Sequence, residues 1–318
     1  MATPTAAELA ALNAATGNIL FTRIARLRLF FPVSTPGDYT HTTSNEVTIN
    51  GIDSPDEPGM RIRFTITKTA EKEPNPGEFI ITNLSPERRA AVQFKGIKVL
   101  FEAGYESTGY ARLFAGDVRT ADSTKNGPDW ETKIRCGDGE RAYVHASISE
   151  SFEAGVTVGD VVKSCAAAFG LPLGNTAAQA AKLKTVLYGG WVAHGPASTA
   201  LEEILRAVGY RFFVHDEQLQ IVGANDHIAT TIPEVSPQSG LIGSPELGSP
   251  EKKGGPATLQ FRSLILPGAR PAGLVSVRSA RHTGIFKWKK AVHTGDTRGP
   301  EWYTAHEATA VSGAAVQP

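Results

Sequence analysis

Three histidines and one aspartate in the last part of the chain are the first candidates for catalysis or metal binding. His293-Thr-Gly-Asp296 places a histidine and an aspartate close enough in sequence to share a proton in general acid–base catalysis. Such a pair also needs a nucleophile and an enclosed pocket, so we favour a strand end followed by a Gly-Asp turn. His282, His293 and His306 offer nitrogens for a metal ion, but no HExxH-type spacing fixes their distances. We therefore expect no catalytic residue, no metal site and no cofactor.

A basic aromatic segment, Lys287-Trp288-Lys289-Lys290, is the second candidate. Basic residues around an aromatic ring can bind a nucleic acid strand by charge and stacking. The same pattern is typical of an amphipathic strand whose outer face is solvated. It would also suit a contact with an acidic neighbouring subunit or the lining of a lumen, and these interpretations stay open.

The acidic residues and glycines show no catalytic spacing. Asp117 in Ala-Gly-Asp and Asp138 in Gly-Asp-Gly are typical turn residues. Carboxylates for glycan cleavage would have to come as a pair, whereas the acidic residues here are scattered over predicted strands and loops. Gly137-Asp-Gly139 and Gly189-Gly190 are too short for a phosphate-binding loop.

The elements that carry these residues are mostly strands in the first half of the chain. Ile62, Phe64 and Ile66 alternate with polar residues, which predicts a half-buried strand. Ser85 is a good N-cap for a short helix that has Pro86 at its first position. We also predict a helix at 5–15, strands at 22–31, 78–82, 98–105, 112–118 and 130–136, a turn at 75–77, and polar connections at 41–50, 106–110 and 120–129.

The pattern changes to helical spacing near residue 147 and returns to alternation after about residue 254. Thr157 is a candidate N-cap, and Gly170 ends the helix that it begins. Asp216-Glu217 is predicted to form the turn of a hairpin. We predict helices at 157–169, 176–187 and 196–209, a hairpin at 210–222, a linker at 232–256, and strands at 257–265, 274–279, 286–294 and 302–310. The fold class is therefore mainly β with an α+β insertion.

The order of elements in residues 61–118 resembles the first tube-like domain of phage tail baseplate hub proteins. That order is strand, turn, strand, capped helix, strand, loop, strand. Further stretches that resemble this family are residues 114–118, 152–161, 239–245, 262–268, 287–296 and 301–304. Together they cover most of residues 20–310.

The resemblance implies a domain organisation and a structural role. It implies two tube-like antiparallel β-barrel or sandwich domains and a small α+β module. It also implies a homotrimeric hub of a contractile tail, a protein without enzymatic activity that joins the trimeric tail spike to the tail tube protein. The expected divisions are an N-terminal helical arm at 1–18, a first tube-like domain at 19–146, an inserted module at 147–231, and a linker with the second tube-like domain at 232–318.

The resemblance also implies further partners and a location. The tape-measure protein and baseplate wedge proteins are possible partners, and DNA would only pass through the lumen. The protein would be assembled in the host cytoplasm and reside in the virion. A tail-associated peptidoglycan hydrolase and the hub of a phage-like injection particle remain as alternatives. In the hub reading, Lys287, Trp288, Lys289 and Lys290 are candidates for the subunit interface or the lumen.

Composition agrees with a globular protein that acts through its surfaces. Of the 318 residues, 41% are hydrophobic and 20% are charged, and the formal net charge is 0. Residues 240–318 hold ten Lys/Arg and five Asp/Glu, so of the totals of 32 and 32 the rest holds 22 and 27. This split either reflects solvated loops or orients two assembly faces. Cys136 and Cys165 are predicted to be buried free thiols, and we expect no signal peptide and no membrane insertion.

Overall fold

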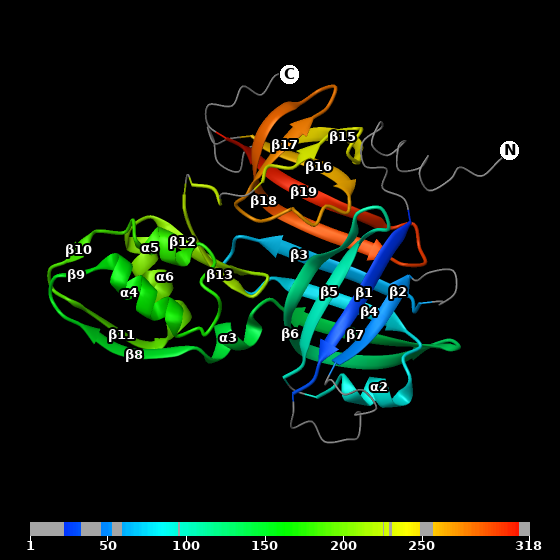
Figure 1. The fold of residues 1–318 in the computed structure, drawn as a ribbon, viewed down its shortest axis with the longest axis horizontal. Helices are drawn as coiled ribbons and strands as arrows, with labels where there is room; N and C mark the ends of the chain where they lie inside the picture. Colours follow the sequence, from blue (N-terminus) through cyan, green and yellow to red (C-terminus); the bar gives the residue numbers. More distant parts are fainter. Residues whose placement is uncertain are drawn as a thin grey trace.

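The computed structural model describes residues 22–32, 46–52, 59–94, 96–224, 226–228, 231–248 and 257–311. The helix predicted at residues 5–15 lies outside the described residues. Strands predominate, and most of them belong to one large sheet (Figure 1). The order of its strands is β15 (Leu241–Gly248), β16 (Thr258–Leu264), β19 (Trp302–Ala310), β18 (Thr283–Asp296), β3 (Ile62–Thr69), β4 (Pro76–Thr82), β7 (Asp129–Gly137), β6 (Gly109–Asn126), β5 (Lys98–Tyr105), β1 (Arg23–Phe30) and β2 (Glu46–Ile52), and neighbours in this order are antiparallel. The short strand β17 (Leu274–Arg278) pairs with the first part of β18, and β14 (Glu234–Val235) pairs with β17 in parallel orientation.

The first β unit, residues 23–137, curls around its own hydrophobic core. Inward positions alternate along each strand, as in β3, where Ile62, Phe64 and Ile66 are buried. Ser85 caps α2 by accepting from the Arg88 N–H at 3.3 Å, which confirms the predicted cap. The elements are β1 (Arg23–Phe30), β2 (Glu46–Ile52), β3 (Ile62–Thr69), β4 (Pro76–Thr82), α2 (Pro86–Ala91), β5 (Lys98–Tyr105), β6 (Gly109–Asn126) and β7 (Asp129–Gly137).

Two polar stretches that were predicted as loops are strands. Residues 46–50 belong to β2, which pairs with β1 and places Val47 opposite Leu29. Residues 120–126 extend β6, and they pair with β7 in a hairpin that projects from the unit (Figure 1). Polar residues suit this hairpin because both of its faces are largely solvated. The outer part of β6 has no apolar stripe and depends on backbone pairing, whereas β2 has a short alternation in which Ile49 is buried and Val47 packs against the core.

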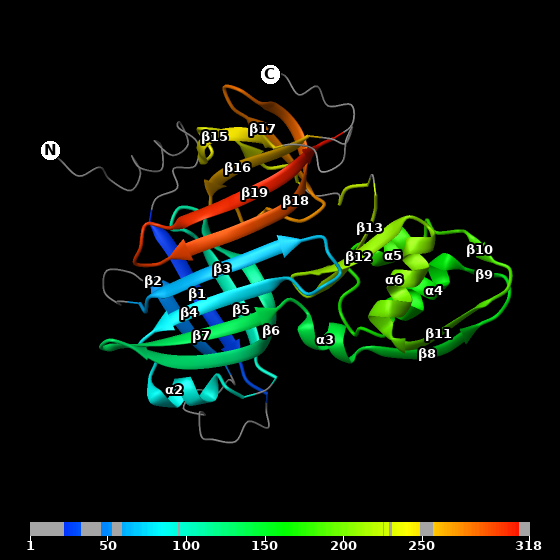
Figure 2. The same ribbon diagram turned by 180° about the vertical axis from the view of Figure 1, so that it is seen from behind.

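The α+β unit, residues 140–223, is a separate lobe with helices packed on short two-stranded sheets (Figures 1 and 2). Thr157 caps α4 as predicted, and its hydroxyl accepts from the Asp160 N–H at 3.2 Å. The elements are α3 (Glu140–His145), β8 (Ser147–Phe152), β9 (Val156–Thr157), α4 (Val158–Ala167), α5 (Thr176–Ala180), β10 (Val186–Leu187), β11 (Trp191–Pro196), α6 (Ala197–Ala207), β12 (Tyr210–His215) and β13 (Gln218–Gly223).

The helix predicted at 176–187 is largely wrong. Only Thr176–Ala180 is helical, and Val186–Leu187 pairs with β9 instead. A buried stripe of apolar residues on α6 confirms the helix predicted at 196–209, with Leu201, Ile204 and Leu205 in the core. The α+β unit has its own cluster of buried side chains, from Ala146 to Ile221.

The second β unit, residues 234–310, consists of β14 (Glu234–Val235), β15 (Leu241–Gly248), β16 (Thr258–Leu264), β17 (Leu274–Arg278), β18 (Thr283–Asp296) and β19 (Trp302–Ala310). The last four confirm the predicted strands. The stretch predicted as a linker at 232–256 is wrong in part, because it contains β14 and β15. Strand β15 pairs with β16 in spite of Pro245, since proline is tolerated on a strand at the edge of a sheet.

The two β units are joined edge to edge by β3 and β18. These strands pair antiparallel from Arg63–Asp296 to Thr69–Lys290, so the sheet runs from one unit into the other without a break (Figure 2). The Tyr105 hydroxyl accepts from the Ile265 N–H at 3.0 Å and adds a buried bond between the units. The domain boundaries predicted from the sequence, at 18/19, 146/147 and 231/232, stay predictions, because separate hydrophobic cores and sheets do not by themselves establish domains.

The hairpin of β12 and β13 attaches the α+β unit to both β units, mainly to the first. Phe213 and Val222 pack against Ala70 and Ala272. Polar contacts surround this small core. The Asn75 amide donates to the Val214 carbonyl at 3.2 Å. Two ion pairs join the same units, Lys98–Glu217 at 2.6 Å and Lys72–Glu202 at 2.8 Å.

Candidate assembly surface

The Lys287–Lys290 segment lies where β18 changes its neighbour. The first part of β18 pairs with β17, and the part from Lys290 onward pairs with β3. The register with β19 shifts between Trp288 and Lys290, so the strand is bulged at Lys289. A bulge changes which side chains face the core beyond it. Trp288 and Ala291 are accordingly both buried, and Lys290 is exposed.

Trp288 is part of the core of the second β unit. Its side chain is 1% exposed, and its indole N–H donates to His306 Nδ1 at 3.1 Å. Because an indole can only donate, His306 carries its proton on Nε2, which donates to the Ser263 hydroxyl at 2.8 Å. The Trp288 ring is therefore not available for stacking at a surface of this chain. The sequence pattern does not show which side of the strand this ring occupies, because that depends on the bulge at Lys289.

The three lysines of the segment have different surroundings. Lys287 is partly buried and donates to the Ala224 carbonyl at 3.2 Å, and burial together with nearby Arg211 lowers its pKa. Lys289 Nζ lies 3.3 Å from Glu307 Oε1. Lys290 is exposed and has no ion-pair partner among the described residues. Among the contacts of the described residues, Lys290 is therefore the candidate residue whose charge is not paired.

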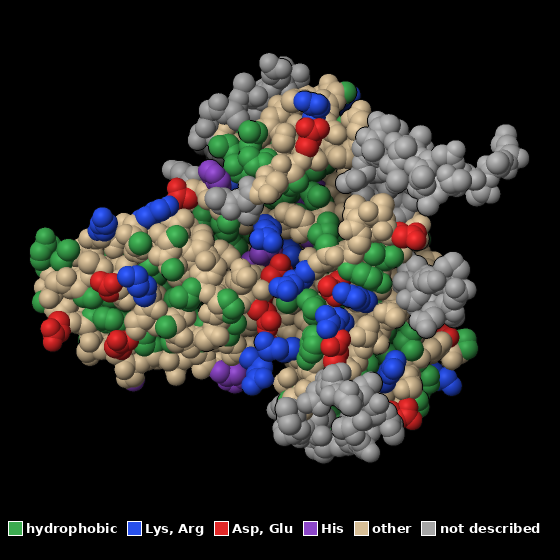
Figure 3. Space-filling model, viewed as in Figure 1, with side chains coloured by type: hydrophobic (Ala, Val, Ile, Leu, Met, Phe, Trp, Pro, Cys, Tyr) green, Lys and Arg blue, Asp and Glu red, His purple; other side chains and the backbone are tan. Residues whose placement is uncertain are grey.

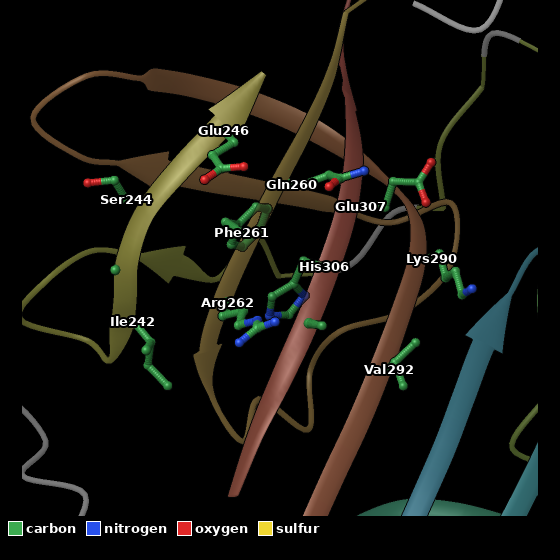
Figure 4. A pocket seen from close by; sticks show the side chains of 12 residues that line it. Ile242, Ser244, Glu246, Gln260, Phe261, Arg262, Lys290, Val292, His306 and Glu307 are labelled. Carbon is green, nitrogen blue, oxygen red and sulfur yellow. The ribbon is translucent and has the colours of Figure 1, made fainter. Parts of the chain in front are cut away.

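A hollow of about 520 Å³ lies over β15, β16, β18 and β19, and Lys290 forms part of its wall. Glu246 from β15 lies on one side and Lys290 from β18 on the other, with Gln260 and Glu307 between them (Figure 4). Both signs of charge thus face the hollow. Its lining residues are Ile242, Gly243, Ser244, Glu246, Gln260, Phe261, Arg262, Lys290, Val292, Ala305, His306 and Glu307.

The same face of the sheet continues over β3, β4 and β7 in the first β unit. Cross-strand ion pairs lie along it, between Glu78 and Lys133 at 2.7 Å and between Arg63 and Glu131 at 2.6 Å. Exposed pairs of this kind contribute only about 0–1 kcal/mol each to stability. The face is therefore a broad polar surface of mixed charge, suited to docking through complementary charge and hydrogen bonds.

The histidines and the aspartate that could have been catalytic have structural partners. His293 is completely buried, its Nδ1 lies 2.9 Å from the Thr304 hydroxyl, and burial holds its pKa well below the usual range. Asp296 pairs with Arg61. Within the described residues, His282, His293 and His306 do not form a group with metal-ligand distances.

The comparison with protein families decides what kind of protein carries this surface. A family model described as baseplate hub gp41 matches residues 46–281. The chain belongs to this baseplate hub family. It is accordingly a structural component of the phage tail baseplate, and the virion tail is its location.

Solved structures of phage tail proteins share the fold of this baseplate hub protein. A tail protein from Neisseria meningitidis MC58 has a TM-score of 0.56 at 12% identity, covering 91% of this chain and 97% of the other. The 43 kDa tail protein of prophage MuSo2 from Shewanella oneidensis has a TM-score of 0.57 at 10% identity, with the same coverages of 91% and 97%. These similarities confirm the mainly β fold class.

A third structure belongs to a secretion apparatus. The E. coli c3393 protein is described as a type VI secretion component similar to the T4 tail proteins gp27 and gp5. Its TM-score is 0.51 at 12% identity, covering 83% of this chain and 76% of the other. No curated protein matches the chain by sequence. In the described part of this hub protein, the helices lack the length and apolar character needed to cross a bilayer.

The remaining candidates of the sequence analysis have structural roles in the hub protein. Asp117 Oδ2 accepts from the Arg141 N–H at 3.0 Å. Asp138 accepts from the backbone of the β12–β13 turn, at 2.6 Å from Asp216 N and 2.7 Å from Glu217 N. Cys136 and Cys165 are buried free thiols, as predicted.

Sequence reasoning missed one group of side chains, Asp138, His215 and Asp216. One ligand-type atom from each lies within 4.8 Å of the others. The sequence signals only a turn at Asp138 and another at Asp216, because 78 residues separate the two aspartates. Only the docking of the β12–β13 hairpin onto the end of β7 brings them together.

Proposed function

We propose that this hub protein forms a trimeric ring that joins the central tail spike to the tail tube. The continuous sheet through β3 and β18 is the observation that supports this role most directly. It holds two β units side by side in one chain as a single rigid surface. A ring of three such chains would present six β units, which would match the sixfold symmetry of a tube. The ring itself would have threefold symmetry, which would match a trimeric spike.

The ends of the sheet are the places where subunits would meet. Strands β15 and β2 end the main strand order of the described residues, and a strand edge that has no partner can pair with another chain. On β15, Ile242 is 42% exposed and Leu247 is 49% exposed. Pro245 interrupts backbone donation from this strand, so we expect the apolar side chains to contribute more at this edge than backbone hydrogen bonds.

The polar face of the sheet would serve as the lumen or as a partner surface. Several of its charges pair within the chain, whereas Glu246, Arg262 and Lys290 are exposed around the hollow and have no ion-pair partner among the described residues. Charge on such a face sets the register and rate of association, and buried apolar contacts supply most of its strength. The tail tube protein is the partner that we assign to one rim of the ring, the spike to the other, and the tape-measure protein to the lumen.

The test is the mass of the complex, measured by light scattering with and without the candidate spike. The proposal predicts a homotrimer, or a monomer that becomes trimeric when the spike is added. A stable dimer in complex with the spike would exclude the ring. Cross-linking between cysteines introduced at β15 and β2 would show whether these two edges meet in the trimer.

A further inference from the structure

Asp138, His215 and Asp216 form a buried group at the junction between the first β unit and the α+β unit. Asp138 follows β7, and His215 and Asp216 end β12 at the turn of its hairpin. Asp138 is 2% exposed and His215 is 5% exposed. Lys, Arg, Asp and Glu side chains gather on the molecular face over this junction (Figure 3). Three potential metal ligands from two parts of the fold therefore meet in one place.

The distance between His215 and Asp216 fits two ligands of a single ion, and the Asp138 oxygen lies within 4.8 Å of both. His215 Nε2 lies 3.4 Å from Asp216 Oδ2. Two ligands of a tetrahedral zinc ion with bonds of about 2.0–2.1 Å lie roughly 3.3–3.4 Å apart. The Asp138 carboxylate is held in place by the N–H groups of Asp216 and Glu217, and each of its oxygens keeps a second lone pair.

His215 is the independent observation that points to a ligand. Neither of its ring nitrogens has a hydrogen-bond partner among the described residues, although both are buried. A buried polar group without a partner costs about 1–3 kcal/mol. A neutral imidazole nitrogen with a free lone pair is the form of histidine that binds metals.

We propose that Asp138, His215 and Asp216 bind a divalent transition-metal ion, for which Zn²⁺ is the best chemical fit. One nitrogen and two carboxylate ligands suit zinc, and a water molecule can complete the tetrahedron. A cavity of about 320 Å³ has room for this water, and its lining includes His215 and Asp216 together with Arg112 and Arg270. The site lies apart from the polar face of the sheet and does not depend on the proposed ring.

Lys68 competes with the ion for the same carboxylates. Its ammonium group lies 3.2 Å from Asp216 Oδ1, and its side chain is 3% exposed. With Lys68 charged, a bound divalent ion gives the group a net positive charge in a buried position. Without that ammonium group, the ion and the two carboxylates balance. Replacing Lys68 by methionine should therefore strengthen metal binding.

A bound ion would connect two parts of the fold that the chain joins only through α3. Asp138 belongs to the end of the first β unit, and the other two ligands belong to the hairpin of the α+β unit. The ion would fix the orientation of the α+β unit on the first β unit. Metal removal should therefore lower the thermal unfolding temperature and increase protease cleavage near the junction, because binding to the folded state stabilises it.

The experiment uses the untagged full chain, stripped with a chelator and titrated with Zn²⁺ by calorimetry and with Co²⁺ by visible absorption. The proposal predicts one ion per chain and the strong absorption of four-coordinate Co²⁺. His215→Gln and Asp138→Asn should each weaken binding by about tenfold or more, and Lys68→Met should tighten it. His145→Gln is the matched control, because His145 is exposed on α3, and it should leave binding unchanged.

The wild-type titration is decisive by itself if the variants do not fold. An absence of stoichiometric Zn²⁺ and Co²⁺ binding to the wild-type chain overturns the proposal. Binding that His145→Gln weakens and His215→Gln leaves intact overturns it as well, since the ion would then sit on the surface. Weaker binding to correctly folded Lys68→Met would also contradict the arrangement.

Discussion

Arg61 and Asp296 form a forked ion pair across the seam between the two β units, although 235 residues separate them in the sequence. Arg61 Nη2 donates to Asp296 Oδ2 at 2.6 Å, and Nε donates to Oδ1 at 3.1 Å. The Arg298 N–H donates to the same carboxylate at 2.9 Å. The Asp296 side chain is 7% exposed, whereas that of Arg61 is 45% exposed. The carboxylate is thus a buried acceptor that closes one end of the β3–β18 ladder.

Replacing Asp296 by asparagine should weaken this seam. Burial alone would raise the pKa of Asp296, but the hydrogen bonds from Arg61 and from the Arg298 N–H lower it below its usual value. Its stabilising contribution is therefore present at neutral pH and is lost as the pH falls through the folded-state pKa. We expect Asp296→Asn to lower the free energy of unfolding by about 1–3 kcal/mol at pH 7, as measured by urea denaturation.

The difference between Asp296→Asn and the wild type should shrink as the pH is lowered toward 3. Arg278→Gln is a suitable control, because Arg278 lies 3.9 Å from Glu234 and both side chains are well exposed. This control should change stability by about 0–1 kcal/mol. An equal loss for Asp296→Asn at both pH values would show that the charge of the carboxylate is not what stabilises the seam.

Reversing the charge of Lys290 should weaken assembly without unfolding the chain. Lys290 is the exposed lysine of the segment, and Lys290→Glu would place a negative charge opposite Glu307 on β19. Charge on a docking face changes mainly the rate and register of association, so we expect a roughly two- to tenfold weaker trimer by light scattering. Circular dichroism should show an unchanged fold.

The matched control for Lys290→Glu is Lys184→Glu, at an exposed lysine of the α+β unit. Reversing Lys287 or Lys289 is less informative, because Lys287 is partly buried and Lys289 already pairs with Glu307. If Lys290→Glu assembles as the wild type does, this lysine lies outside the subunit and spike contacts.

Removing the indole N–H of Trp288 should destabilise the second β unit. Trp288→Phe leaves His306 Nδ1 buried without its donor and removes volume from a fully buried position. We expect the unfolding free energy to fall by about 2–4 kcal/mol. Trp130→Phe is the control, since Trp130 is 37% exposed and contacts Arg89. If Trp288→Phe lowers the unfolding free energy no more than Trp130→Phe does, Trp288 does not contribute to the core of this unit as described.

The purified chain should not degrade bacterial cell walls. His293 is hydrogen-bonded to Thr304, and Asp296 is paired with Arg61. The polar face of the sheet carries ion pairs rather than an enclosed acid–base pair. Zymography on peptidoglycan checks this expectation, with a lysozyme as the positive control. Clear lysis by the chain alone would favour the hydrolase alternative over a purely structural hub.

Local patterns in the sequence are enough to predict much of the secondary structure. The alternation in β3, the Ser85 and Thr157 caps and the apolar stripe of α6 all depend on residues close in sequence. The order of these elements also carries the resemblance to baseplate hubs. The outer part of β6 was missed because it has no apolar stripe, and β2 was missed because its alternation is limited to Val47 and Ile49 within a polar stretch.

The candidate surface and the buried cluster depend on pairings between distant segments. Sequence alone determined that residues 287–290 form a basic strand, but the bulge at Lys289 and the core around His306 decided that Trp288 points inward. Asp138 was predicted as a turn residue, and its place beside His215 follows from docking of the α+β unit. The conformational preferences of neighbouring residues determine the helices and strands. Long-range contacts determine strand register and packing, and these decide which side chains come together in one site.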